Sequence, residues 1–91
     1  MKMEEKEEIT KQEFEVLFNI EFMNITDPKT ISSRLEISEK EAENILKKLE
    51  QKGLIKIEYR ENKACSSQLT SKGSEVYEND KYLNWKLELG Y

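Results

Sequence analysis

The sequence predicts an α+β fold, mostly α, with a three-helix core, a two-stranded β-hairpin and a C-terminal helix. Residues 27–55, DPKTISSRLEISEKEAENILKKLEQKGLI, predict two helices joined by a turn so short that only a helix-turn-helix unit fits. The residues that follow alternate between apolar and polar side chains, as the strands of a hairpin do. A hairpin placed directly after a helix-turn-helix unit is the mark of a winged helix-turn-helix fold.

The chain of 91 residues is long enough for one compact domain and too short for a second, catalytic one. We expect residues 1–9 to form a disordered acidic arm, residues 10–78 the winged-helix domain, and residues 79–91 a C-terminal tail. No internal repeat or interdomain linker is visible in the sequence. We therefore expect a single folded unit.

The first predicted helix opens at Thr10, because Thr10 and Glu13 have the spacing of a capping box. Its apolar side chains recur at helical spacing, so we expect them in the core. They are Phe14, Val16, Leu17, Phe18, Ile20, Phe22 and Met23.

The second and third predicted helices also carry start signals. Asp27, placed before a proline, caps a short helix that ends by Leu35 or Glu36. After a brief turn, Ser38 caps the third helix, and a glutamate three residues later completes a second capping box. These signals set the boundaries of the helix-turn-helix unit.

The third helix separates into an apolar arc and a polar pole when its residues are placed at about 100° each. The apolar arc, which should face the core, holds Ala42, Ile45, Leu46 and Leu49. The opposite pole carries no acidic residue and holds Lys40, Asn44, Lys47 and Gln51. That pole is the face on which we expect function.

The wing is predicted from a glycine and an alternating strand. Gly53 is placed to end the third helix in a left-handed conformation, and the alternation from Ile55 to Arg60 predicts the first strand. A polar tip at residues 61–63 and a return strand over residues 64–70 complete the hairpin. A further short helix then follows through Tyr77.

The tail fits two secondary structures. Residues 80–91 alternate as a strand would and also form a helical seam, and we favour the helix. A domain of this size has little interior left for the apolar side chains of the tail, so we expect a homodimer built through them. These side chains are Tyr82, Trp85, Leu87 and Leu89. The alternative is a tail that packs over the first helix of the same chain.

The net charge of −4 and the pI near 5.0 argue at first against a nucleic-acid partner. The distribution of charge matters more, because residues 47–63 alone carry a basic excess. The basic residues of this window are Lys47, Lys48, Lys52, Lys56, Arg60 and Lys63, against Glu50, Glu58 and Glu61. The window covers the end of the third helix and the hairpin, the parts that a winged helix presses against a duplex.

The composition disfavours several function classes. Histidine is absent, cysteine occurs once and no Gly-rich phosphate loop is present, so we expect no enzyme, no metal site and no cofactor. No apolar run has the length of a bilayer span, and we expect a cytoplasmic protein without membrane contact. Cys65 falls in the return strand, where a buried small residue and a redox-active thiol are both open.

The run ISSRLEISEKEAENILKKLEQKGLIKIEYRENKACSSQLTSKGSEVY resembles the winged helix-turn-helix domains of bacterial and archaeal transcription regulators. Its segment LTSKG is similar to the segment that follows the wing in the MarR family. The resemblance covers roughly residues 27–78. It implies a sequence-specific protein for double-stranded DNA that regulates transcription, with a winged helix that binds another protein as the alternative.

In that family the third helix enters the major groove, the second helix steadies it on the backbone, and the wing reaches the backbone and the minor groove. The matching positions here are Lys29, Ser33 and Arg34 on the second helix, Ser38, Lys40, Asn44 and Lys47 on the third, and Arg60 and Lys63 on the wing. Gln51 joins them from the polar pole of the third helix, and Lys52 and Lys56 are expected to meet phosphates.

Some positions depart from the family pattern. Residues 60–63, RENK, stand where the family often has an Asp-x-Arg pair, and Glu36 stands in the turn where glycine is frequent. Glu39 and Glu43 occupy positions where basic residues are common. We also expect a chain of this length to lack the long terminal helices that build the dimer and the effector pocket, so the resemblance implies a reduced version.

Overall fold

The computed structural model describes residues 9–89, and the acidic arm assigned to residues 1–9 lies outside it except for Ile9. Ile9 itself is buried in the core, so it does not belong to an exposed arm. The elements in chain order are α1 (Lys11–Glu21), α2 (Pro28–Leu35), α3 (Glu39–Gln51), β1 (Ile55–Arg60), β2 (Lys63–Leu69), α4 (Ser71–Tyr77), the 3-10 turn η2 (Asp80–Tyr82) and α5 (Leu83–Glu88). The predicted mostly helical fold with one hairpin is confirmed.

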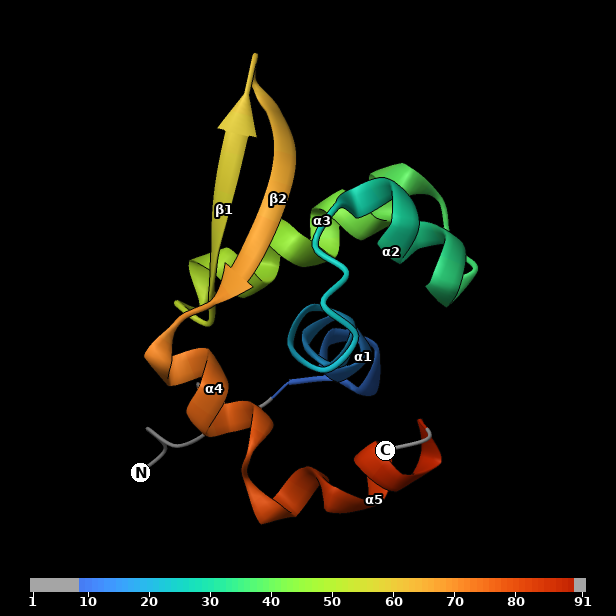
Figure 1. The fold of residues 1–91 in the computed structure, drawn as a ribbon, viewed down its shortest axis with the longest axis vertical. Helices are drawn as coiled ribbons and strands as arrows, with labels where there is room; N and C mark the ends of the chain where they lie inside the picture. The colour runs from blue at the N-terminus through green and yellow to red at the C-terminus, as the bar shows by residue number, and fades with distance from the viewer. Residues whose placement is uncertain (1–8, 90–91) are drawn as a thin grey trace.

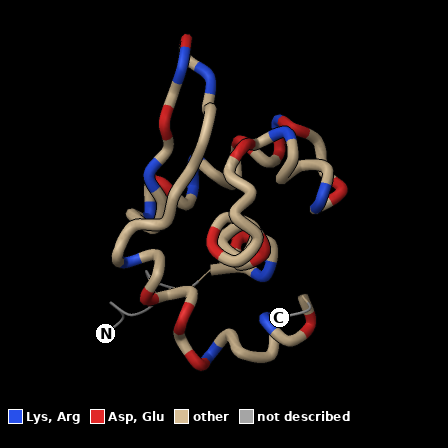
Figure 2. The backbone as a smooth tube through the Cα atoms, in the orientation of Figure 1, with Lys and Arg blue, Asp and Glu red and all other residues tan. Residues whose placement is uncertain are grey.

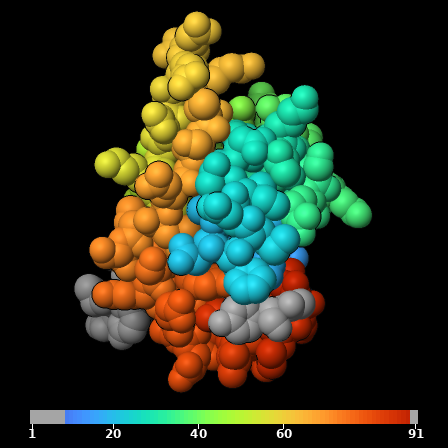
Figure 3. Space-filling view, in the orientation of Figure 1, coloured from blue at the N-terminus to red at the C-terminus, as the bar shows by residue number. Residues whose placement is uncertain are grey.

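The helices surround α1, which runs through the centre of the molecule (Figure 1). Helices α2 and α3 lie on one side of it, and α4 and α5 lie at the end opposite the hairpin tip. The two strands pair antiparallel and point away from the helices, so that the molecule measures 39 × 29 × 19 Å. In the space-filling view only the outer end of the hairpin protrudes from the body (Figure 3).

The predicted caps are present at the starts of the first three helices. The Glu13 backbone N–H donates to Thr10 Oγ1 at 3.0 Å, and the Glu41 N–H donates to Ser38 Oγ at the same distance. Both reciprocal bonds of each capping box are formed. Asp27 accepts a bond of 2.8 Å from the backbone of the third residue after it. Each of these three helices therefore begins directly after the capping residue that the sequence predicted.

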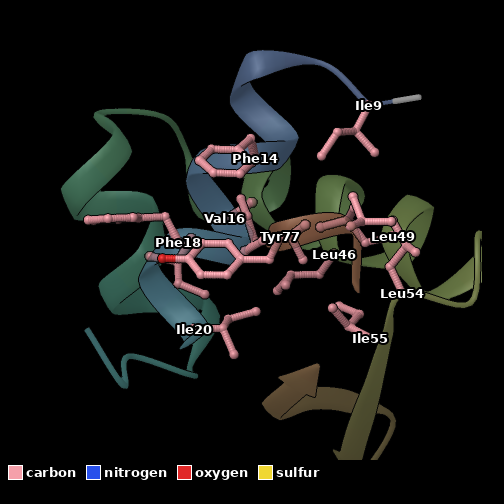
Figure 4. Close-up of a cluster of buried hydrophobic side chains, with 14 of the residues drawn as sticks. Ile9, Phe14, Val16, Phe18, Ile20, Leu46, Leu49, Leu54, Ile55 and Tyr77 are labelled. Atoms are coloured by element: carbon pink, nitrogen blue, oxygen red, sulfur yellow. The ribbon is translucent and has the colours of Figure 1, made fainter. Parts of the chain in front are cut away.

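The core is made from α1, α2, α3, the base of the hairpin and the C-terminal helices (Figure 4). Its fully buried side chains include Phe14, Val16, Leu17, Ile31, Ala42, Leu46, Leu49 and Leu54. The predicted stripe was wrong at its end, since Phe22 is 50% exposed and Met23 is also exposed. Helix α1 stops at Glu21, and Asn24 in the left-handed region (φ 59°) turns the chain away from the core.

The hairpin has a tighter tip than the predicted three-residue loop. Arg60 pairs with Lys63, so Lys63 already belongs to β2 and only Glu61 and Asn62 form the turn. Both turn residues have positive φ, 54° and 68°, as a type I′ turn requires. The register also shifts between Glu58 and Tyr59, which places a bulge in the middle of the wing.

The segments LEQKGLI and LTSKG meet at the base of the wing. Gly53 adopts φ +79° and ends α3 as predicted. Thr70 then closes the joint, because its hydroxyl donates to the Gly53 carbonyl at 2.7 Å and its N–H donates to the Leu54 carbonyl at 3.0 Å. Gly73 packs so closely on Leu54 that a Cβ there would lie 1.9 Å from the carbonyl oxygen. The two segments thus set the angle at which the hairpin leaves the body.

The tail is helical, as favoured, and packs on α1. Tyr82 is buried, and the rings of Tyr82 and Trp85 lie 5.5 and 5.8 Å from the ring of Phe14. Glu88 forms an ion pair with Lys11 at the start of α1. The prediction that Tyr82 lies on a dimer surface is therefore wrong, because the interior of this small domain accommodates it after all. No helix within residues 9–89 is long and apolar enough to cross a membrane.

Candidate nucleic-acid interface

Helix α3 presents the predicted polar row to solvent. Ala42, Leu46 and Leu49 are buried, which fixes the rotation of the helix about its axis. All four residues of the opposite pole are exposed, and we call them the polar row: Lys40, Asn44, Lys47 and Gln51. Their side chains combine amide groups, which donate and accept hydrogen bonds, with ammonium groups that carry positive charge.

The start of α3 lies beside this row. Ser38 is exposed, and its oxygen accepts the capping bond from Glu41. Its own hydroxyl proton remains available for an external acceptor, because the cap uses only a lone pair. Glu39 and Glu41 are exposed in the first turn, where the helix dipole favours negative charge. The acidic residues of α3 are thus explained by helix stability.

Helix α2 carries its three predicted residues in two different environments. Lys29 and Ser33 are exposed on its outer surface. Arg34 is also exposed, but its Nε donates to Asn19 Oδ1 of α1 at 2.9 Å. Asn19 is buried, and its Nδ2 donates in turn to the Glu15 carbonyl at 2.8 Å. Arg34 therefore ties α2 to α1, a role that only the unusual Asn within an apolar stripe could have suggested.

The wing places two cations at its far end. Arg60 and Lys63 face each other across the turn, and both are exposed. Lys and Arg positions alternate with acidic ones along the hairpin (Figure 2). Lys56 is exposed nearer the base of the same hairpin. The wing is thus a narrow, polar extension with positive charge at both ends of its first strand.

Lys52, which the sequence assigned to phosphates, forms an ion pair within the chain. Its ammonium lies 2.8 Å from Glu13 Oε1, and the two side chains are only 31% and 6% exposed. This ion pair connects the end of α3 to the start of α1. A phosphate contact of Lys52 stays a prediction, and it would compete with this ion pair.

A second link joins α3 to the wing. The Tyr59 hydroxyl donates to Glu50 Oε1 at 3.0 Å. Partial burial and the neighbouring Glu50 carboxylate together raise the pKa of Tyr59 above its ordinary value, since both disfavour the phenolate. The sequence did not indicate this pair, because it does not give the angle at which β1 meets α3.

The described residues offer few other features that could hold a ligand. Within residues 9–89, no group of three or more acidic or cysteine side chains could hold a metal ion. An open groove of about 350 Å³ lies along the hairpin and is lined by Lys56, Ile57, Glu58, Ser66 and Gln68. Cys65 is half-buried and is the extra residue of the bulge, since Glu58 pairs with Ser66 and Tyr59 with Ala64.

Comparison with known proteins yields two similar structures. No protein-family model matches the sequence, and a search of curated proteins finds no match. The crystal structure of a MarR family transcription regulator superposes with a TM-score of 0.70 at 19% identity over 91% of this chain. Wild-type ZitR from Lactococcus lactis, solved in complex with DNA, superposes with a TM-score of 0.67 at 26% identity over 91% of this chain.

Both similar proteins are longer. The matched region covers 57% of the MarR family chain and 61% of the ZitR chain. The shared part includes the three-helix core and the hairpin of this chain, since 91% of its residues are matched in each case. The chain therefore has the MarR-like winged-helix fold that the sequence predicted.

Proposed function

We propose that this chain binds double-stranded DNA sequence-specifically and regulates transcription, with α3 in the major groove and the wing on the backbone and minor groove. The observation that carries the proposal is the polar row, which is exposed along its whole length and free of acidic residues. An α-helix with such a face fits the width of the major groove. The likeness of the fold to a protein solved in complex with DNA supports DNA as the partner.

The polar row has the chemistry for reading bases. The Asn44 amide can accept from N6 and donate to N7 of an adenine, and the ammonium of Lys40 or Lys47 can donate to O6 and N7 of a guanine. Each good base contact contributes about 1–3 kcal/mol of discrimination. Gln51, about two turns after Asn44, offers the same amide chemistry.

The remaining exposed cations and hydroxyls would meet the backbone. We assign Lys29, Ser33 and Arg34 of α2, Ser38 of α3 and Arg60 and Lys63 of the wing to phosphates. Such contacts set the register without reading sequence and make binding depend on salt. The acidic remainder of the chain repels the duplex, so we expect weak non-specific binding.

A selected duplex tests the proposal. Duplexes are first selected from a random pool with the full chain, and the affinity for a selected one is then measured by fluorescence anisotropy at several salt concentrations. The pair Asn44→Ala and Lys47→Ala should lower the affinity by about tenfold or more, because two base contacts are lost. The matched control is Lys72→Ala with Asn84→Ala, two exposed positions on α4 and α5. Equal affinities for both double variants would rule out the polar row as the reading face.

A protein-binding winged helix is the second candidate. The observations that favour it are the net charge of −4 and the exposed ring of Phe22 beside the exposed Met23. The two candidates predict different binding of genomic DNA at low ionic strength. A DNA-binding chain should bind the duplex there and release it as salt is added. Absence of retention at every salt concentration would favour the protein partner.

We also propose that two copies of the chain associate through α5. Of the predicted residues, Leu87 is 59% exposed, whereas Trp85 and Leu89 are half-buried against the core. Leu83 lies one turn before Leu87 and is 48% exposed. It was not among the residues that the sequence predicted for the dimer surface. These two leucines form the apolar strip that a second copy would cover.

A further inference from the structure

A hydrogen bond outside the core joins the wing to α3, between the Tyr59 hydroxyl and Glu50 Oε1 at 3.0 Å. We infer that Tyr59 is a positioning residue for DNA binding, which holds the outer half of the wing at a set angle to α3. The inference rests on the proposed function, because it assigns the pair a role in presenting two elements to one duplex. Tyr59 is 44% exposed, so its side chain adds little to the core.

The outer half of the wing needs such a support. Ile55 and Ile57 anchor the base of the hairpin by burial in the core. The bulge between Glu58 and Tyr59 then interrupts the ladder, and bulges bend a strand and increase its twist. Beyond the bulge, residues 60–63 are all exposed. A two-stranded hairpin is only marginally stable alone, so contacts with α3 decide the direction in which its tip points.

Tyr59 stands where the bend begins and reaches the flank of α3. Its partner Glu50 lies directly before Gln51 and three residues after Lys47, so the carboxylate borders the polar row. The hydrogen bond fixes that carboxylate on the side of α3 that faces the wing. It also holds the Arg60 and Lys63 cations in place before binding, which lowers the conformational entropy lost in the complex.

The support can be tested first in the free protein. Amide hydrogen exchange of residues 60–64 should accelerate in Tyr59→Phe, which removes only the hydroxyl, while exchange in α1 stays unchanged. Glu50→Gln keeps a carbonyl acceptor for the hydroxyl, so exchange at the wing tip should remain slow. Unchanged exchange in Tyr59→Phe would overturn the inference irrespective of DNA.

Affinity for a selected duplex tests the functional part. Tyr59→Phe should weaken binding by about two- to tenfold, the range expected for one lost hydrogen bond. In a chain that already carries Arg60→Ala and Lys63→Ala, the same substitution should have no further effect, because the wing tip then has no cation to position. Tyr82→Phe, which removes a hydroxyl on the η2 side of the molecule, is the matched control.

The outcomes separate the inference from the proposed function. An equal loss of affinity in both backgrounds would mean that Tyr59 contacts the duplex directly, and it would overturn the positioning role alone. An unchanged affinity in Tyr59→Phe would also overturn the positioning role and would leave the proposed function standing. A wild-type chain that retains no duplex at low salt would overturn the proposed function and this inference together.

Discussion

At the scale of single residues, two glycines at the base of the wing have separate reasons to be glycine. Gly53 needs a positive φ of +79°, and nothing lies within 4 Å of the Cβ that another residue would add there. Gly73 has no such backbone requirement but lies against the Leu54 carbonyl. Backbone conformation requires glycine at position 53, and lack of space requires it at position 73. The sequence alone does not distinguish these two reasons.

Gly73→Ala should destabilise the protein strongly. The added Cβ would lie 1.9 Å from the Leu54 oxygen, which is backbone and cannot rotate aside. Relief requires α4 to move away from the base of β1, at a cost of about 1–3 kcal/mol or more. Urea denaturation measures the loss, with Lys72→Ala as the control in the same turn. A midpoint shift no larger than that of the control would contradict the close packing.

At the scale of elements, the helices are linked by a few polar contacts as well as by the core. Glu13 completes the capping box of α1 and also pairs with Lys52 at the end of α3. Asn19 and Arg34 link α1 to α2. The capping role of Glu13 followed from its spacing to Thr10, whereas its pairing with a residue 39 positions away did not. Local spacing predicts caps, and only packing creates such distant pairs.

Glu13→Ala should cost more stability than Lys52→Met. The first substitution removes both the cap acceptor of α1 and the carboxylate that Lys52 contacts, for which we expect a loss of about 2–4 kcal/mol. The second leaves the cap intact, since Glu13 still accepts from the Thr10 N–H, but it takes the ammonium away from a buried carboxylate, so its loss should be smaller than that of Glu13→Ala without being negligible. Thermal or urea unfolding of both variants checks the order. A reversed order would contradict the dual role of Glu13.

The cap of α2 should make stability depend on acid pH. The backbone N–H of Thr30 donates to Asp27 and holds the pKa of that carboxyl below its ordinary value of 3.8. A depressed folded-state pKa means that the stabilisation is present above the unfolded-state pKa and is lost as the pH falls through the folded-state pKa. Asp27→Asn keeps a cap oxygen that does not titrate. Between pH 5 and pH 2, the wild-type chain should therefore lose stability relative to this variant, as measured by urea unfolding at each pH; a constant difference would contradict the role of Asp27.

At the scale of the whole molecule, the C-terminal helices complete the core on the face of α1 away from α2 and α3. Tyr77 stacks on Phe14 with ring centroids 5.4 Å apart, and Tyr82 and Trp85 extend the cluster. Lys86, although buried, places its ammonium 4.4 Å from the Tyr77 ring. The tail is thus an integral part of the fold, and only one side of α5 remains for another molecule.

Self-association should depend on that exposed side alone. Leu83→Glu with Leu87→Glu should shift the chain toward monomer in sedimentation velocity experiments without lowering its unfolding midpoint, because both residues are exposed. Trp85→Ala is the contrasting variant and should lower the free energy of unfolding by about 2 kcal/mol or more, since it removes a ring packed on Phe14. A wild-type chain that sediments as a monomer at high concentration would exclude the proposed dimer.

Periodicity, cap spacing and one glycine were sufficient to predict the helices, the hairpin and the winged-helix arrangement of this chain. They also predicted which pole of α3 is exposed, because burial of Ala42, Leu46 and Leu49 fixes the opposite face. These features follow from interactions between residues a few positions apart, which the order of residues encodes directly. The exposed face of a helix is as predictable as its buried one.

Contacts between distant parts of the chain could not be obtained in this way. The pairing of Lys52 with Glu13, the tether from Arg34 to Asn19 and the bond from Tyr59 to Glu50 each join two elements whose relative angle is set by packing. The same packing buries Tyr82 and leaves Phe22 exposed. Both residues are aromatic, so the side chain alone does not decide which ring is buried. The direction in which each element meets its neighbours decides it.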